Sequence, residues 1–160
     1  MLISFLVIYT ILCIVIFFMQ RKLLYVPFGN AVTPEEVGLD QYKQIFITTS
    51  DNQKLRAWYH ESKKSDDVIL YFHGNAANLE NRNNKYHEFA ENSNYSILAI
   101  TYRGYPGSTG SPSEQGFYLD AEAAIKFLND SGFKNQNIIL YGESIGSGVA
   151  TEMATRINAK

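Results

Sequence analysis

The chain opens with an uninterrupted apolar run over residues 1–19, in which only Ser4 and Thr10 fall outside the hydrophobic set and no residue is charged. A helix of that length rises about 28 Å, roughly the thickness of a bilayer core. A cleaved signal peptide is the alternative, but no Lys or Arg precedes the run and no small-residue cleavage pattern follows it. We therefore expect residues 1–20 to form a single-pass transmembrane anchor, with the lipid bilayer as the partner of residues 1–19.

The polar pattern begins with Arg21 and Lys22, directly after the run. Positive charges next to a membrane segment favour the cytoplasmic side, which predicts a cytoplasmic body. Residues 21–41 then contain two Pro and two Gly, at Pro27, Gly29, Pro34 and Gly38. This composition predicts an irregular connector between the anchor and the body.

From residue 42 the apolar positions follow the periods of strands and helices. Residues 42–49 and 55–60 flank a turn at 51–52, which predicts an antiparallel hairpin. Short apolar runs at 68–72, 96–102 and 138–141 are typical of strands that are buried on both faces. Alternation of such strands with helices predicts an α/β fold with a mainly parallel sheet.

Two helices are predicted between these strands. The first is a polar stretch at 78–91. The second begins with Ser111 as the N-cap, Pro112 in the first helical position and Glu114 in the third, which together form a capping box. Its apolar positions recur at helical spacing and end near Gly132, where a helix should stop; they are Phe117, Ala121, Ala124, Ile125 and Leu128.

Composition excludes several classes of protein. The 14 Lys and Arg against 16 Asp and Glu leave a net charge of −2, which offers no basic surface for nucleic acid. The single cysteine, Cys13, can form neither an intrachain disulfide nor a cysteine zinc cluster. We expect no cofactor and no metal. The length suits one globular domain.

The segment Gly142-Glu143-Ser144-Ile145-Gly146 follows the predicted strand 138–141 and precedes a helix-compatible stretch. This is a G-x-S-x-G pattern in the context of a nucleophile elbow, where the serine sits on a tight strand-to-helix turn. The glycines leave room for the turn and for the neighbouring strand. We expect Ser144 to be a nucleophile with the helix amides beside it. The alternative is an ordinary glycine-rich turn.

The segment 73–78, His-Gly-Asn-Ala-Ala-Asn, follows the predicted strand 68–72. Acyl transfer needs two backbone N–H donors for the oxyanion, one from the residue after the nucleophile and one from the loop after an earlier strand. We expect these donors to be Ile145 and Asn75, with Gly74 allowing close approach of the backbone. His73 is expected to shape this loop rather than to carry protons.

The segment 102–110, Tyr-Arg-Gly-Tyr-Pro-Gly-Ser-Thr-Gly, follows the predicted strand 96–102. Its glycines suggest a phosphate-binding loop, but the G-x-x-x-x-G-K pattern is absent. We expect a structural loop in which Arg103 makes buried polar contacts.

These motifs, HGNAAN at 73–78, YRGYPGSTGSPSEQG at 102–116 and YGESIGSG at 141–148, resemble the α/β-hydrolase superfamily. With QRKLLYVP at 20–27, the chain is most similar to the membrane-anchored abhydrolase-domain branch related to serine aminopeptidases. The resemblance implies that residues 42–160 are the N-terminal part of a hydrolase domain. It implies Ser144 as nucleophile, Asn75 and Ile145 as oxyanion donors, and a sheet truncated after the nucleophile elbow.

The resemblance also implies an acid and a histidine after the nucleophile, and these 160 residues contain no histidine after Ser144. His60, His73 and His87 all precede it. A serine without a base is a poor nucleophile. Two functions therefore remain open. The first is a membrane-anchored serine hydrolase acting on an ester, thioester or amide, whose missing half is supplied by another, C-terminal polypeptide or lies outside these 160 residues. The second is a non-catalytic remnant or binding module that keeps the first half of the fold.

Overall fold

The computed structural model describes residues 2–76 and 78–160. Met1 of the expected anchor and Ala77 of the 73–78 motif lie outside the described residues. Nine helices and strands follow one another in the described chain: α1 Leu2–Leu24, β1 Lys43–Thr48, β2 Lys54–His60, β3 Val68–Phe72, α2 Asn83–Asn92, β4 Ser96–Ile100, α3 Glu114–Asp130, β5 Ile138–Gly142 and α4 Ile145–Arg156. Short 3-10 turns lie at Glu35–Val37, Leu79–Arg82 and Asn135–Asn137.

The five strands form one mixed sheet in the order β1-β2-β4-β3-β5. The predicted hairpin is confirmed, since β1 and β2 pair antiparallel, and β2 pairs antiparallel with β4. Strands β4, β3 and β5 are parallel, with Val68 opposite both Ser96 and Ile138. The carboxyl ends of these three strands therefore reach the same edge of the sheet, where ligands bind in open α/β sheets.

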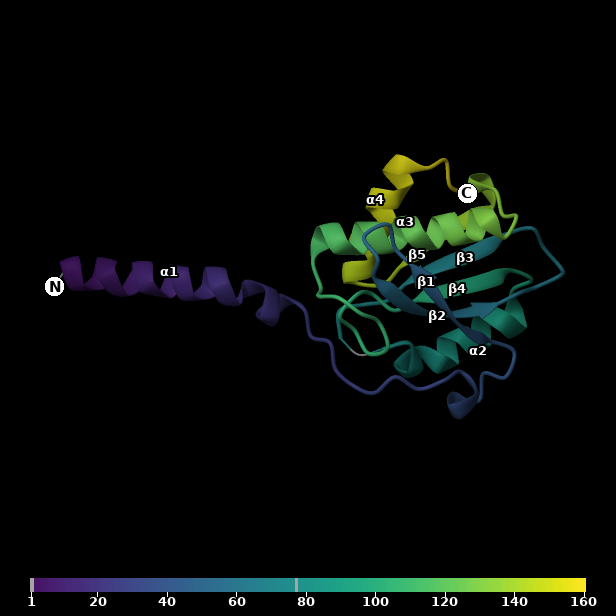
Figure 1. Ribbon diagram of the computed structural model, residues 1–160, viewed down its shortest axis with the longest axis horizontal. Helices are drawn as coiled ribbons and strands as arrows, with labels where there is room; N and C mark the ends of the chain where they lie inside the picture. Colours follow the sequence, from purple (N-terminus) through teal and green to yellow (C-terminus); the bar gives the residue numbers. More distant parts are fainter. Residues whose placement is uncertain (1, 77) are drawn as a thin grey trace.

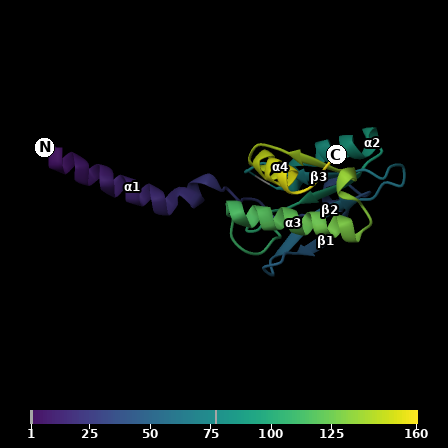
Figure 2. The same cartoon turned by 90° about the horizontal axis from the view of Figure 1, so that it is seen from above.

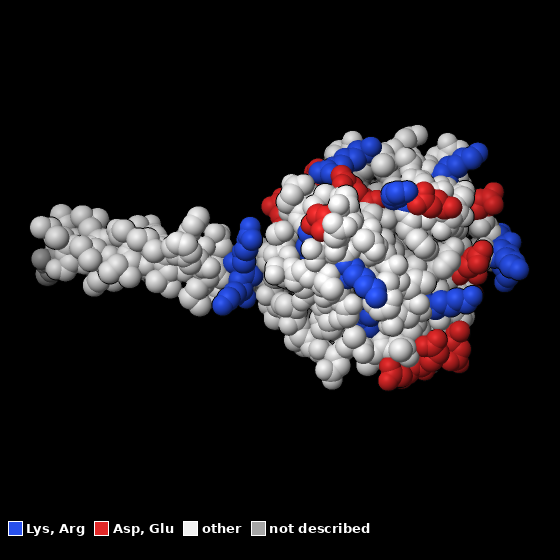
Figure 3. All heavy atoms as spheres, viewed as in Figure 1, with Lys and Arg blue, Asp and Glu red and all other residues white. Residues whose placement is uncertain are grey.

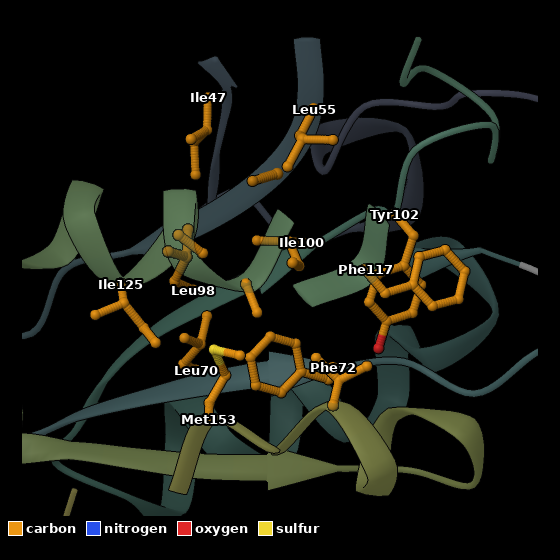
Figure 4. Packing of buried hydrophobic residues seen from close by; sticks show 14 of the residues in the cluster. Ile47, Leu55, Leu70, Phe72, Leu98, Ile100, Tyr102, Phe117, Ile125 and Met153 are labelled. Carbon is orange, nitrogen blue, oxygen red and sulfur yellow. The ribbon is translucent and has the colours of Figure 1, made fainter. Parts of the chain in front are cut away.

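Helices cover both faces of the sheet, with α3 and α4 on one side and α2 on the other (Figure 1; Figure 2 shows the view from above). Side chains of a strand alternate between its two faces. Leu70 and Phe72 accordingly pack with the α3 and α4 residues (Figure 4). Ile69 and Tyr71 pack with Tyr86 of α2 on the other face. This alternation explains why β3 and β4, covered twice, are apolar at every position but Ser96.

The start of α3 corrects the predicted capping box. The N-cap is Ser113, whose Oγ accepts the amide of Gly116 at 3.1 Å, and Ser111 and Pro112 lie in the preceding loop. Pro112 packs so closely on Gly104 that a Cβ placed there would lie 3.0 Å from the Pro112 Cγ. Pro112 therefore belongs to the loop that packs on Gly104 and not to the first turn of α3. Gly132 ends the helix with φ +98°, as predicted.

Helix α1 is long and apolar enough to cross a membrane, with a mean hydropathy of 2.9 over its most apolar window. It projects away from the body and buries none of its described residues (Figure 1). Arg21 and Lys22 lie in its last turn, where basic side chains gather between the helix and the body (Figure 3). The helix continues beyond the expected anchor to Leu24, and the connector runs along the body from there (Figure 1).

Candidate active site

Ser144 lies on the tight turn between β5 and α4. Its φ is positive, at +52° with ψ −117°, and Asn52 is the other described non-glycine residue with positive φ. Such a conformation costs about 1–3 kcal/mol and persists only where surrounding contacts hold it. The turn is closed by the amide of Gly146, which donates to the Glu143 carbonyl at 2.9 Å. The G-x-S-x-G segment is therefore a strained turn between a strand and a helix, called the elbow below.

Gly142 and Gly146 are required by close backbone approaches. A Cβ on Gly142 would lie 2.6 Å from the carbonyl carbon of Gly146. A Cβ on Gly146 would lie 2.7 Å from the carbonyl carbon of Phe72 and 2.8 Å from the carbonyl oxygen of His73. The first glycine permits the turn itself, and the second lets the elbow rest on the end of β3.

The same approach brings together the two segments expected to supply oxyanion donors. Phe72 is opposite Gly142 in the parallel pair β3–β5, and the Glu143 amide donates to the Phe72 carbonyl at 3.0 Å. The loop that carries Asn75 therefore leaves the sheet beside the elbow. Ile145 is the first residue of α4, and the first amides of a helix have no carbonyl partner within it.

His73 is fully buried at the start of this loop. Its Nδ1 donates to the Gly74 carbonyl at 2.7 Å, and its Nε2 accepts the Tyr102 amide at 3.4 Å. Burial lowers the pKa of His73 to about 4, so the ring is neutral at pH 7. Each ring nitrogen is hydrogen-bonded to a backbone group of one of the two loops, so His73 links these loops.

Arg82 and Glu143 form an ion pair that the sequence did not indicate. Nη2 of Arg82 lies 2.8 Å from Oε1 of Glu143, and Lys85 and Tyr71 donate to the other carboxylate oxygen. Partial burial opposes ionisation, but hydrogen bonds from Arg82, Tyr71 and Lys85 lower the pKa of Glu143 to about 2. Gly74 packs against this pair, since a Cβ there would lie 3.1 Å from each partner. No local pattern links positions 61 residues apart.

The loop after β4 confirms the expected buried contacts of Arg103. Its Nε donates to Asp120 at 2.8 Å, its amide donates to the same carboxylate, and Nη1 donates to Asp51 at 2.7 Å. The hydrogen bond from Arg103 and a second from Thr49 lower the pKa of Asp51 to about 2. Arg103 thus ties the loop to α3 and to the β1–β2 turn.

The other two histidines lie elsewhere in the described structure. His60 is opposite Ile97, at the end of the sheet where β4 begins, and its Nδ1 is 3.1 Å from the Gln41 carbonyl. His87 lies on α2 against Gly38. Within residues 2–76 and 78–160, the Ser144 hydroxyl makes no hydrogen bond to a histidine.

An apolar cavity of about 250 Å³ lies beside the elbow. It is bordered by the end of α1, the first turns of α3 and the first turn of α4; the lining residues are Leu24, Tyr25, Glu114, Phe117, Tyr118, Ile145, Gly148 and Val149. The cavity therefore joins the residue after Ser144 to the end of the apolar helix.

Comparisons with known proteins support an α/β-hydrolase-like fold. The family model described as Chlamydia CHLPS protein (DUF818) matches residues 41–158. The chain is 35% identical over 131 residues to Protein bem46 of Schizosaccharomyces pombe, covering 79% of this chain and 44% of that protein. It is 31% identical to alpha/beta hydrolase domain-containing protein WAV2 of Arabidopsis thaliana, over 81% of this chain and 45% of that protein. It is 32% identical to the uncharacterized membrane protein YNL320W of Saccharomyces cerevisiae, over 86% of this chain and 50% of that protein.

Solved structures show the same fold. The alpha-beta hydrolase from Vibrio vulnificus superposes with a TM-score of 0.70 at 27% identity, over 85% of this chain and 51% of that one. The Pyrococcus furiosus esterase Pf2001 gives a TM-score of 0.65 at 28% identity, over 80% and 51%. The chain spans about half the length of the relatives it matches.

Proposed function

Because the chain belongs to the Chlamydia CHLPS protein (DUF818) family and to the abhydrolase-domain branch of the α/β hydrolases, we propose that it is a membrane-anchored serine hydrolase component. In this proposal Ser144 transfers the acyl group of an ester, thioester or amide to water. The observation that carries it is the positive φ of Ser144, on a turn between Gly142 and Gly146 at the end of a parallel strand.

The proposed chemistry starts with attack of the Ser144 Oγ on the substrate carbonyl carbon. The carbonyl oxygen becomes an oxyanion, which the amides of Asn75 and Ile145 would stabilise. The serine proton passes to a base, the leaving group departs, and water hydrolyses the acyl-enzyme. The apolar cavity beside Ile145 offers room for an apolar part of the substrate.

The base is proposed to come from outside these 160 residues, either from further chain or from a separate C-terminal polypeptide. His73 does not suit this role because both of its nitrogens are engaged and burial disfavours its protonation. Without a base, the oxyanion amides and binding alone usually leave about 10³–10⁴-fold acceleration over water. We expect feeble turnover of an activated ester by the 160-residue chain.

A non-catalytic binding module is the second candidate, favoured by the lack of contact between Ser144 and any described histidine. Labelling with a fluorophosphonate separates the two, because this reagent reports a reactive serine. We expect slow labelling of the chain in detergent, none with Ser144→Ala, and unchanged labelling with Ser131→Ala, an exposed serine at the end of α3.

Adding the C-terminal half of a relative that contains a late histidine should accelerate both labelling and turnover. Complete absence of labelling, with and without that half, would favour the binding module. Rapid stoichiometric labelling of the 160-residue chain alone would show instead that the base lies within it.

A further inference from the structure

Two buried tyrosines in the loop after β4 have similar ring environments but different hydroxyl contacts. Tyr102 and Tyr105 both pack on His73, with ring centroids 4.4 and 5.1 Å away, and both pack on Phe117. The Tyr105 hydroxyl donates to Asn75, lying 2.7 Å from its carbonyl oxygen and 2.8 Å from its Oδ1. Among the described residues, the Tyr102 hydroxyl has no hydrogen-bond partner.

The Asn75 side chain is also held by the end of α1 and the start of the connector. Its Oδ1 accepts the Val26 amide at 3.2 Å, and its Nδ2 donates to the Leu24 carbonyl. Asn75 therefore joins three segments, namely the 73–78 loop, the loop after β4 and the start of the connector.

These contacts restrict the peptide planes on both sides of the Asn75 Cα. The Gly74–Asn75 peptide is trans, so its carbonyl and its N–H point in opposite directions. His73 holds that carbonyl, which directs the Asn75 N–H away from His73. Tyr105 holds the carbonyl of the next peptide, Asn75–Ala76. With both carbonyls held, the Asn75 amide has little freedom to rotate.

We propose that Tyr105 is a positioning residue whose hydroxyl holds Asn75 by its carbonyl and its side-chain oxygen, so that the Asn75 amide stays aimed at the oxyanion formed at Ser144. This inference rests on the proposed function, because the direction of this amide affects reactivity only if Ser144 attacks an acyl or phosphonyl centre. Catalysis by oriented donors is sensitive to displacements of about 1 Å, which cost up to about 10²-fold in rate. Removing one hydroxyl contact should therefore slow the reaction without affecting binding of the reagent.

The test compares Tyr105→Phe with Tyr102→Phe in the full chain in detergent. The two substitutions each delete one buried hydroxyl from the same aromatic cluster. Saturation kinetics of Ser144 phosphonylation by a fluorophosphonate, followed by intact-protein mass spectrometry, give a limiting rate constant and a half-saturation concentration. We expect Tyr105→Phe to lower the limiting rate constant about tenfold with unchanged half-saturation, and Tyr102→Phe to change neither more than twofold. A merely structural role for Tyr105 would not produce this split.

Hydrogen exchange of the peptide covering 73–79 supplies a readout that does not need a reactive serine. Exchange in this peptide should become faster in Tyr105→Phe and stay unchanged in Tyr102→Phe. Wild-type labelling rates in Tyr105→Phe, equal losses in both variants, or unchanged exchange in Tyr105→Phe would each overturn the inference. Failure of the wild-type chain to label at Ser144, with and without the C-terminal half of a relative, would instead contradict the proposed function, and the exchange comparison would still decide whether the Tyr105 hydroxyl holds Asn75.

Discussion

Nη2 of Arg82 lies 2.8 Å from Oε1 of Glu143, the residue immediately before Ser144. The same guanidinium donates to the carbonyls of Asn78, at 2.9 Å from Nη1, and of Ala76, at 3.3 Å from Nη2. One side chain from the turn before α2 thus connects the elbow to the loop that carries Asn75. The relative position of the two predicted oxyanion segments depends on this ion pair as well as on the sheet.

Replacing Arg82 with Met should lower the free energy of unfolding by about 2 kcal/mol, because it leaves the partly buried Glu143 carboxylate with fewer donors. Arg82→Lys should recover part of the loss. Lys126→Met is the matched control, since it breaks an exposed pair with Asp130 in which both side chains are more than half accessible. Such a pair contributes about 0.3–0.5 kcal/mol. Urea unfolding followed by circular dichroism measures all three, and equal effects of Arg82→Met and Lys126→Met would contradict the prediction.

Gly146→Ala and Gly148→Ala should have opposite effects on stability, although the two glycines lie only two positions apart in α4. A Cβ at Gly146 meets the Phe72 and His73 carbonyls, whereas a Cβ at Gly148 has nothing within 4 Å. We expect Gly146→Ala to destabilise by about 1–3 kcal/mol through overpacking, and Gly148→Ala to stabilise by up to about 1 kcal/mol through helix propensity. Thermal unfolding of both variants checks this, and a neutral Gly146→Ala would show that the elbow is not packed as described.

Neutral His73 predicts a pH dependence of stability. Burial lowers its pKa from 6.5 to about 4, so the unfolded chain binds the extra proton first as the pH falls. This contribution is fully present above about pH 6.5 and is lost between there and about pH 4, amounting to roughly 3 kcal/mol at about 1.4 kcal/mol per pH unit. His73→Asn keeps a donor and an acceptor but does not titrate. Urea unfolding at pH values from 7 to 4.5 should show a smaller loss of stability in this variant than in the wild-type chain. If the free energy of unfolding fell equally with pH in both proteins, a group other than His73 would be responsible.

Helix α1 predicts that the full chain fractionates with membranes and resists extraction by high salt, because its attachment is hydrophobic. A double substitution, Leu12→Arg with Val15→Arg, places two charges in the apolar run at a cost of about 2.5–3.5 kcal/mol each at the bilayer centre. It should shift protein toward the soluble fraction. Immunoblotting of salt-washed membranes measures this. Recovery of the uncleaved wild-type chain in the soluble fraction, without detergent, would count against the anchor.

Much of the arrangement was predictable because its signals are local. The features that were predicted depend on residues near one another in sequence. They are the apolar run, the strand 68–72, the hairpin, the stop at Gly132 and the position of the G-x-S-x-G segment between β5 and α4. The start of α3 shows the limit of such signals. Ser111 and Ser113 both offer an N-cap hydroxyl, and the packing of Pro112 on Gly104 decides between them.

Local patterns were enough to predict the α/β fold class, the position of the apolar helix and the candidate residues Ser144, Asn75 and Ile145, because periodicity and turn chemistry are encoded over a few neighbouring positions. How those candidates are held depends on contacts between segments that are far apart in the chain. Arg82 reaches Glu143 across 61 residues and Tyr105 reaches Asn75 across 30, through hydrogen bonds that exist only after the parallel strands have brought their carboxyl ends to one edge. Such contacts depend on where the sheet places each loop in space, and no local spacing specifies them.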